Sequence, residues 1–393
     1  MPDLPEGWSE SALGDVVTLK RGYDLPKRSR REGPVPVISS SGYSGNHNEA
    51  KVDAPGVVTG RYGTIGEVYY IEENFWPLNT ALYVRSFHGN DPLFISYFLR
   101  TLNFEAYTDK AAVPGINRNH LHQERVVIPE PEEQQRIASV LRLLDDRIAL
   151  NRRMNRTLEA LAASLFRQRF VAFEGQGPLV DSGTPLRAIP EGWVVRPIGD
   201  VLKTVGGSTP STKVAEFWDG GSVHWTTPKD LSSLDTPVLL DTARQITEAG
   251  LAKISSGLLP AGTVLMSSRA PVGYLAIAEI PVAVNQGYIA FPPSDEFSNL
   301  FILFWLRANM DRIVGRAGGT TFKEISKRGF RPMLMAVPPA ELRAEFETVA
   351  RPLYDRIVAN EKQSRTLAAL RDELLPELIS GRLRVPETLD DLI

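Results

Sequence analysis

The stretch LPEGWSESALGDV at residues 4–16 returns almost unchanged as IPEGWVVRPIGDV at residues 189–201. Seven of the thirteen positions are identical, and two more exchange Leu for Ile. Solenoid repeats recur every ~20–50 residues, so the much longer spacing seen here indicates a duplicated domain instead.

Three further pairs of segments extend the duplication. GRYGTIGEVYY around Arg61 matches SSRAPVGYLAI around Arg269, LFISYFLR at 93–100 matches LFILFWLR at 300–307, and residues 131–173 match 340–382. The offset between the copies rises from 185 at the first pair to 208 at the two arginines. The second half therefore carries about 23 extra residues between Val201 and Arg269, which we expect to include STPSTKVAEFWDGGSVHWTTPKD.

The composition is that of a soluble globular protein, with 42% hydrophobic and 23% charged residues among 393. This length predicts two or three domains. The absence of cysteine excludes disulfides and thiolate metal sites. With no bilayer-spanning apolar run and no signal pattern, we expect a cytoplasmic protein without a membrane partner. The net charge of −3 means that nucleic-acid binding would need local basic patches.

Both copies end in a segment with heptad spacing, which is typical of long coiled-coil helices. The stripes are apolar at both ends and polar in the middle, and we expect the two helices to pair antiparallel, with Asn151 meeting Asn360. The alternative is that each helix packs only on its own domain. Pro352 should kink or start the second helix. The pairing residues are Ile137, Leu141, Leu144, Ile148, Asn151, Leu353, Ile357, Asn360 and Leu367.

The remaining blocks contain short apolar runs separated by Gly, Pro and Ser, plus one compact helix each, at 93–100 and 300–307, whose apolar face should be core. The predicted fold class is α+β, with two similar domains separated by two long antiparallel coiled-coil helices. The expected segments are a first domain at 1–130, a central helix at 131–173, a linker at 174–188, a second domain at 189–339, a C-terminal helix at 340–381 and a tail at 382–393.

Motifs of common enzymes are missing from the chain. There is no Walker loop, no glycine-rich dinucleotide or S-adenosylmethionine loop, and no Asn/Asp-Pro-Pro-aromatic stretch of an amino-methyltransferase. His120 and His122 lack a third metal ligand, and Asp24 with Glu49 and Lys51 only loosely resembles a nuclease site. We therefore expect neither a catalytic nor a metal site in this chain.

Several polar segments favour nucleic-acid binding. KRGYDLPKRSRRE from Lys20 is strongly basic and suits phosphate contacts, although a solvated surface loop is the alternative. Arg61 and Arg269 lie at matched turns, from which an Arg can reach guanine edges or simply brace the turn. AVPGINRNH and GGTTFKEISKR are matched basic loops, whereas Phe217, Trp218 and Trp225 are expected to form local core. The candidate DNA-binding residues are Lys20, Arg21, Lys27, Arg28, Arg61, Tyr62, Asn117, Arg118, Lys203, Lys213, Lys229, Arg269, Gln286, Thr320, Thr321 and Lys323.

Taken in order, these segments resemble the specificity subunit of type I restriction–modification systems. LPEGW…LGDV, GGSTPSTKVAEFWDGGSVHWTTPKDL at Gly206, SSRAPVGYLAI at Ser267 and VNQGYIAF at Val284 resemble its target-recognition domains. VIPEPEEQQRIASVL at Val127 and LAALRDELLPELISGRLRV at Leu367 resemble its spacer regions. The resemblance covers nearly the whole chain.

The resemblance implies a non-catalytic DNA-binding subunit. Each recognition domain would read half of a split, asymmetric double-stranded DNA site, and the coiled coil would set the gap. Two methyltransferase subunits would carry S-adenosylmethionine, and restriction subunits would use ATP and Mg, so no cofactor is expected in this chain. Because the first domain lacks the WTTPKD segment, the two domains should read different sequences. The alternatives are a methylation-only complex and a coiled-coil scaffold that does not bind DNA.

Overall fold

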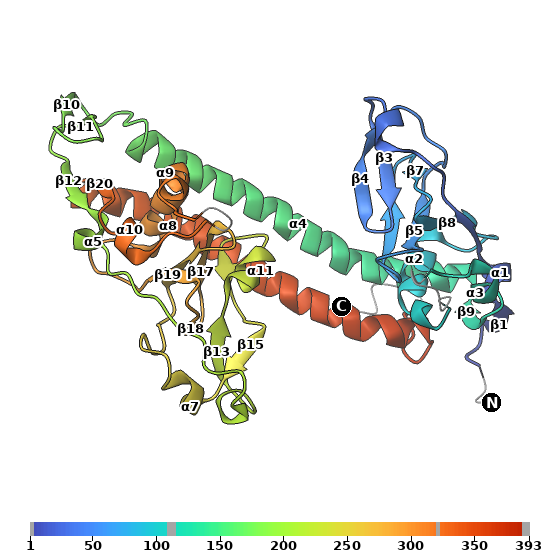
Figure 1. Cartoon of the computed structure of the whole chain (residues 1–393). Helices are drawn as coiled ribbons and strands as arrows, with labels where there is room; N and C mark the ends of the chain where they lie inside the picture. The colour runs from blue at the N-terminus through green and yellow to red at the C-terminus, as the bar shows by residue number, and fades with distance from the viewer. Residues whose placement is uncertain (1–3, 108–114, 320–322, 387–393) are drawn as a thin grey trace. The chain divides into compact units, whose positions relative to one another are not determined.

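The computed structural model describes residues 4–107, 115–319 and 323–386, which form two compact units. The first unit combines Met1–Ile148 with Thr366–Ile393, and the second is Ala149–Arg365. Both long helices, α4 (Pro131–Phe170) and α11 (Ala340–Ile379), contribute one half to each unit (Figure 1).

The first unit is built on a four-stranded sheet in the order β2-β8-β5-β6, a three-stranded sheet β4-β3-β7 and the pair β1-β9. Helix α2 (Pro92–Arg100) buries Phe94, Phe98 and Leu99 in the core of this unit, as its apolar sequence predicts. The other elements are β1 (Trp8–Ala12), α1 (Leu13–Val16), β2 (Thr18–Arg21), η1 (Lys27–Ser29), β3 (Val35–Ser39), β4 (Gly42–His47), β5 (Gly56–Gly60), β6 (Val68–Ile71), β7 (Trp76–Pro77), β8 (Ala81–Ser86), η2 (Phe104–Tyr107), α3 (Arg118–Leu121) and β9 (Arg125–Pro129).

The second unit repeats this plan with sheets β14-β17-β16-β19 and β15-β13-β18 and the pair β12-β20. Helix α8 (Asn299–Ala308) takes the place of α2 and is buried in the same way. The other elements are β10 (Leu179–Asp181), β11 (Ala188–Pro190), β12 (Val194–Pro197), α5 (Ile198–Val201), η3 (Ala215–Phe217), β13 (Val223–Thr226), α6 (Pro228–Ser232), β14 (Val238–Leu239), β15 (Arg244–Ile246), α7 (Glu248–Leu251), β16 (Thr263–Ser268), β17 (Val272–Ala278), β18 (Ala283–Val284), β19 (Tyr288–Phe291), α9 (Met310–Gly315), α10 (Lys327–Phe330) and β20 (Leu334–Val337).

The repeated PEGW is a tight turn that packs an indole against the end of a long helix. The Trp8 amide donates to the Pro5 carbonyl at 3.0 Å, and the Trp193 amide donates to that of Pro190 at 3.1 Å. The third residue of each turn has a positive φ, +76° at Gly7 and +85° at Gly192, which glycine adopts without strain.

The two indoles stand at matching helix ends. Trp193 lies against Phe170, the last residue of α4, with ring centroids 6.1 Å apart. A Cβ on Gly381, just after α11, would lie 3.0 Å from the Trp8 ring. Each PEGW copy therefore packs on the helix end that belongs to its own unit.

The glycine of the repeated GDV is needed for a different reason, which is a close approach of two segments. The Gly14 amide donates to the His122 carbonyl and the Gly199 amide to the Arg331 carbonyl, both at 2.9 Å. A Cβ at Gly14 would lie 3.1 Å from the His122 Cβ, and one at Gly199 would lie 2.8 Å from the Arg331 Cβ. Only glycine leaves room for this close approach in both domains.

Within each unit the two long helices run antiparallel, which confirms the predicted pairing. In the first unit Arg371 forms an ion pair with Asp145 at 2.6 Å, and Arg384 binds Glu133 through two nitrogens at 2.5 Å. In the second unit the Asn155 amide donates to Glu361 at 2.8 Å, and Arg169 donates to Glu345 at 2.9 Å. The partner residue number falls as the α4 residue number rises, as antiparallel pairing requires.

The helices also pack on their own domains, although not only on them as the alternative requires. Ile137 and Leu141 share a core with Phe98 and with Leu378 of the other helix. Phe166 packs edge-on against Phe301 of α8, at 5.3 Å, and against Phe346 of α11, at 5.4 Å. Each helix half is thus a structural part of the domain beside it.

The polar middle of the two stripes forms a buried layer in the second unit. Asn151, Asn155 and Asn360 are all buried. Asn360 donates to Asn155 Oδ1 at 2.8 Å, whereas Asn151 donates to Gln363 at 2.9 Å and to Ser364 at 3.1 Å. Asn151 reaches only the backbone carbonyl of Asn360, at 3.4 Å, so the side chain that Asn360 meets is Asn155.

The structure corrects three expectations about the segments. Helix α11 begins at Ala340, twelve residues before Pro352, so the proline does not start it. The expected linker at 174–188 contributes to a hairpin, β10 paired with β11 (Figure 1). In the expected tail, Val385 is buried in the first core and Arg384 binds Glu133.

The extra residues of the second domain also lie elsewhere than predicted. β3 pairs in parallel with β7 at Val37 and Trp76, as β13 pairs with β18 at Trp225 and Ala283. Val37 thus corresponds to Trp225, 188 residues later, only three more than the 185 of the PEGW repeat. Most of the insertion therefore follows β13, and STPSTKVAEFWDGGSVHWTTPKD largely has a counterpart in the first domain.

No helix in the described part of the chain is long and apolar enough to cross a membrane. Within the same residues, no three His, Asp or Glu side chains are grouped so that they could hold a metal ion.

Candidate nucleic-acid interface

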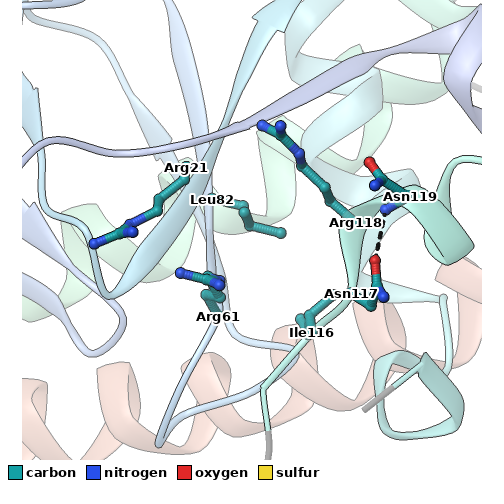
Figure 2. A pocket seen from close by; sticks show the side chains of 7 residues that line it. All are labelled: Arg21, Arg61, Leu82, Ile116, Asn117, Arg118 and Asn119. Atoms are coloured by element: carbon teal, nitrogen blue, oxygen red, sulfur yellow. Dashed lines mark hydrogen bonds between the residues drawn. The ribbon is translucent and has the colours of Figure 1, made fainter. Parts of the chain in front are cut away.

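Four of the predicted DNA-binding residues meet at one cavity of the first unit. Arg21, Arg61, Asn117 and Arg118, which come from three separate parts of the chain, line a space of about 320 Å³ together with Leu82, Ile116 and Asn119. Figure 2 shows the side chains of Arg21, Arg61 and Arg118 arranged around Leu82. We call this group the arginine pocket.

Local structure explains how each arginine reaches the pocket. Arg21 is the last residue of β2, and Arg61 directly follows β5. Arg118 is the first residue of α3, and the side chain of the preceding Asn117 caps this helix by accepting the Asn119 amide at 3.1 Å. The Ile116 amide donates to the Arg61 carbonyl at 3.1 Å, which holds the two segments together.

The positive charge of the pocket is only weakly compensated. Arg21 faces Asp24 at 3.7 Å, where both side chains are more than half exposed. The guanidinium of Arg61 lies 4.5 Å from the centre of the Tyr62 ring, a cation–π contact that leaves its N–H groups available. Neither Arg61 nor Arg118 forms an ion pair within residues 4–107, 115–319 and 323–386. Such a group of cations suits an anionic ligand.

The second unit has a reduced version of the same pocket. Ser326 caps α10 as Asn117 caps α3, and Lys327 follows it as Arg118 follows Asn117. The Lys327 ammonium would lie 3.2 Å from a Cβ on Gly206, the counterpart of Arg21. One lysine thus stands where the first domain has three arginines.

The predicted equivalence of Arg61 and Arg269 is wrong by one residue. The Arg61 amide donates to the Thr80 carbonyl at 3.0 Å, and the matching donor to Gly287 is Ser268, at 2.8 Å. The isolated bridge of Tyr62 with Gly115 corresponds to that of Arg269 with Glu324. Arg61 therefore corresponds to Ser268, and Arg269 occupies the position of Tyr62. Matching the two sequences by residue type aligned the arginines, because residue type alone does not reveal the hydrogen-bond register of a turn.

Arg269 also differs in its surroundings. Its guanidinium lies 3.9 Å from the Glu324 carboxylate, with both side chains partly exposed. This contact braces the turn, as the alternative interpretation of Arg269 expects, and leaves the arginine accessible.

The other predicted residues of the first domain lie outside the arginine pocket. Lys20 contacts Tyr23, with its ammonium 5.3 Å from the ring centre. Lys27 and Arg28 are exposed on η1. Tyr62 is half-buried beneath Arg61.

Most predicted residues of the second domain are exposed but scattered along the chain. Lys203, Lys213, Lys229 and Lys323 are not buried. Gln286 is exposed and accepts a hydrogen bond from the Thr209 hydroxyl at 2.7 Å. Thr320 and Thr321 lie outside the described residues.

The residues of the weak metal and nuclease patterns bind partners within the protein. His122 Nε2 accepts the Leu19 amide at 2.9 Å, and burial, followed by the nearby Arg118, lowers the pKa of this imidazole. This hydrogen bond occupies a ring nitrogen that could bind a metal. Asp24 accepts a hydrogen bond from Asn79, and Glu49 pairs with Lys51.

Of the three aromatic residues predicted as local core, Trp225 is 3% exposed and Trp218 packs partly buried against the same cluster, whereas Phe217 is partly buried outside it. The prediction did not include their neighbour Arg244, whose guanidinium lies 3.6 Å from the centre of the Trp218 ring. It also missed Ser326 and Lys327 as individual residues. Their place within the matched loop GGTTFKEISKR, 209 residues beyond Asn117 and Arg118, was the available signal.

Comparisons with known proteins all identify the same family. A profile described as the type I restriction modification DNA specificity domain matches residues 5–160 and 190–343. The MjaIX specificity subunit of Methanocaldococcus jannaschii is 35% identical over 193 residues, 49% of this chain and 44% of that protein, so the chain matches less than half of that relative. The HindI specificity subunit of Haemophilus influenzae is 23% identical over 330 residues, 69% of this chain and 71% of its own length.

A solved structure shares the fold over the full length. The type I restriction–modification S subunit from M. genitalium aligns with a TM-score of 0.62 at 17% identity, and the alignment covers 99% of each chain. The profile match, which covers most of the chain, shows that the chain belongs to the type I restriction–modification DNA specificity family.

Proposed function

We propose that this chain reads a two-part, asymmetric DNA site, with one half-site for each domain. The family supports a role in DNA recognition. The observation that carries the proposal is the arginine pocket, where three guanidinium groups surround one cavity and, among residues 4–107, 115–319 and 323–386, only the exposed Asp24 forms an ion pair with them. Phosphate oxygens and guanine edges are the DNA groups that arginine binds best.

The two domains should contribute to DNA binding by different groups. In the first domain we assign contacts to Arg21, Arg61, Asn117 and Arg118, with Lys20, Lys27, Arg28 and Tyr62 nearby in sequence. In the second we retain the predicted residues and add Ser326 and Lys327, the counterparts of Asn117 and Arg118. The predicted residues retained for the second domain are Lys203, Lys213, Lys229, Arg269, Gln286, Thr320, Thr321 and Lys323.

The proposed partners follow from the family resemblance. The chain would bring two methyltransferase subunits, which carry S-adenosylmethionine, and restriction subunits, which use ATP and Mg, to the DNA in the cytoplasm. The two long helices would set the gap between the half-sites, and the two reading domains would keep the predicted bounds of 1–130 and 189–339.

The test uses the chain assembled with its methyltransferase subunits. Arg61→Gln and Arg118→Gln should each weaken methylation through the first half-site by about 10-fold, because each removes one bidentate donor to the DNA. Lys327→Gln is the matched change in the second domain. The slope of log affinity against log salt should fall by about one for each phosphate that a variant no longer binds.

The outcome also separates the alternatives. If wild-type complexes bind all DNA sequences equally and without salt dependence, the chain is a scaffold and the proposal fails. A specificity subunit of a methylation-only complex would show the same half-site effects, but no cleavage when restriction subunits of the same host are added.

A further inference from the structure

Arg244 is held by two indole rings in the second domain. Its guanidinium carbon lies 3.6 Å from the centre of the Trp218 ring and 5.6 Å from that of Trp225. The two rings meet edge to face, with centroids 5.1 Å apart. A guanidinium carbon 3.6 Å from the ring centre is in van der Waals contact with the face of the ring, which restricts how the guanidinium can turn.

The indoles themselves are anchored. Trp225 is buried and donates from Nε1 to the Ser208 carbonyl at 3.2 Å, while Trp218 donates from Nε1 to the Ser211 carbonyl at 3.1 Å. Their hydrogen bonds join the stack to the loop at 208–211. In the same loop, the Thr209 hydroxyl holds the exposed Gln286 at 2.7 Å. The two indoles and the loop at 208–211 thus connect Arg244 to Gln286, and both of these side chains are exposed.

The N–H groups of Arg244 remain available. Arg244 is exposed and lies on β15, an edge strand of its sheet. Among residues 4–107, 115–319 and 323–386, no carboxylate forms an ion pair with it and no acceptor takes its guanidinium hydrogens. A structural arginine on a protein surface normally satisfies some of its five N–H groups with carboxylates or carbonyls.

The first domain has no such arginine at the matching position of its sheet. β4 pairs with β3 as β15 pairs with β13, so Asn46 of the first domain corresponds to Gln245 of the second. The residue before Asn46 is Gly45, whereas the residue before Gln245 is Arg244. The arginine beside Gly45, Arg30, is already used, because it donates to the Ser44 carbonyl. The stacked arginine is therefore a feature of one domain.

A stacked plane favours base reading over phosphate binding. A phosphate can be bound by a mobile lysine, which acts as a point charge and needs no fixed orientation. A guanine presents two acceptors, N7 and O6, in the major groove and is recognised by the paired N–H groups of an oriented guanidinium. Fixing the plane in advance also lowers the entropic cost of binding.

We propose that Arg244 reads a guanine in the half-site of the second domain. The proposal rests on the DNA-reading function proposed above. Trp218 and Trp225 are positioning residues that orient the guanidinium and do not contact the base.

The experiment measures methylation by the assembled complex on targets altered at one base pair at a time. Arg244→Lys and Arg244→Gln should both lose about 10-fold of discrimination at one G·C pair of the second half-site. Preferences in the first half-site should stay unchanged, which also shows that the complex is assembled. Trp218→Leu should lose part of the same discrimination at the same base pair. Arg187→Gln, which removes one exposed charge from the β10–β11 hairpin, is the matched control.

Other results would overturn the assignment. If Arg244→Lys keeps every preference while Arg244→Gln weakens all targets equally and lowers the salt slope by about one, Arg244 contacts a phosphate. Unchanged behaviour of both variants would make the stack purely structural. If the wild-type complex shows no preference in either half-site, the proposed function itself has failed.

Discussion

The two domains have the same frame but different contacts at equivalent positions. In the first, neutral His122 accepts the Leu19 amide at 2.9 Å. At the matching position in the second, Arg331 donates to the Thr204 hydroxyl at 2.8 Å and to its carbonyl at 2.9 Å. Both contacts tie the segment before the last strand to the segment after GDV. Duplication has thus kept the geometry of this joint while its chemistry diverged.

The arginine pocket diverged further than the joint. Arg21 and Arg61 correspond to Gly206 and Ser268, and only the cation at Arg118 is retained, as Lys327. In the opposite direction, the second domain has the stacked Arg244 at the place of Gly45. Residues that hold the frame are repeated, and residues available to a ligand are not, which is the pattern expected of two readers of different sequences.

The largest effect is expected from changing the length of the shared helices, because that leaves both domains intact. Four residues inserted after Asn151 and four after Gln363 would keep the antiparallel partners matched and add about 6 Å to each helix. At ~3.4 Å per base pair, the preferred gap between half-sites should grow by one or two base pairs. Methylation of a series of targets with stepwise gaps measures this.

A matched two-residue insertion is the control, since it turns each stripe by about 200° and exposes its apolar side. If the four-residue variant folds and still prefers the parental gap, the helices do not set the spacing.

The next largest effect is a loss of stability when either of the two GDV glycines is replaced by alanine. Gly199→Ala would place a Cβ 2.8 Å from the Arg331 Cβ, and Gly14→Ala would place one 3.1 Å from the His122 Cβ. We expect Gly199→Ala to lower the free energy of unfolding by about 1–3 kcal/mol and Gly14→Ala by less. Urea unfolding of both variants measures the difference, and hydrogen exchange at residues 198–205 and 13–20 assigns it to a domain. Equal losses of stability would mean that the neighbours adjust equally well.

A similar loss of stability is expected in the buried polar layer of the helices. Asn360→Leu removes the donor to Asn155 Oδ1, which is 2.8 Å away and buried. An acceptor left without a partner costs about 1–3 kcal/mol, so the unfolding midpoint in urea should fall. The double variant Asn155→Leu with Asn360→Leu should recover part of this stability. If Asn360→Leu alone is more stable than the wild type, the layer is not held by this hydrogen bond.

The smallest expected effect is a pH dependence of stability in the first domain that the second domain lacks. Burial, and then Arg118, lower the pKa of His122 below its ordinary 6.5, so the folded state takes up its proton at lower pH than the unfolded state does. The contribution of neutral His122 is complete above about pH 6.5 and is lost as the pH falls towards the folded pKa. The second domain has Arg331 at the position of this histidine.

Hydrogen exchange, corrected for its intrinsic pH dependence, should show the Leu19 region opening more readily at about pH 5.5 than at about pH 7.5, on either side of the ordinary histidine pKa, while the Thr204 region stays constant. His122→Gln, whose amide nitrogen and oxygen do not titrate, should abolish the difference. A pH response of equal size in both regions would show that His122 is not its source.

The sequence by itself determined the duplication, the α+β class, the long helices and the family. These follow from local patterns: heptad spacing, alternating apolar runs, and turns that require glycine at positions 7 and 192. Among the short apolar runs of the first domain, VYYI forms β6 and ALYV lies in β8. Residues that carry an exposed positive charge were also identified correctly, because the charge follows directly from the residue type.

Only the tertiary structure decided which of these residues come together. Arg21, Arg61 and Arg118 lie far apart in the chain, and they share one cavity because β2, β5 and α3 pack there. The one-residue difference between Arg61 and Arg269 became visible only in the hydrogen-bond register, and the oriented guanidinium of Arg244 only in its stack on Trp218. Register and long-range packing depend on contacts between distant segments, which no local pattern in the sequence contains.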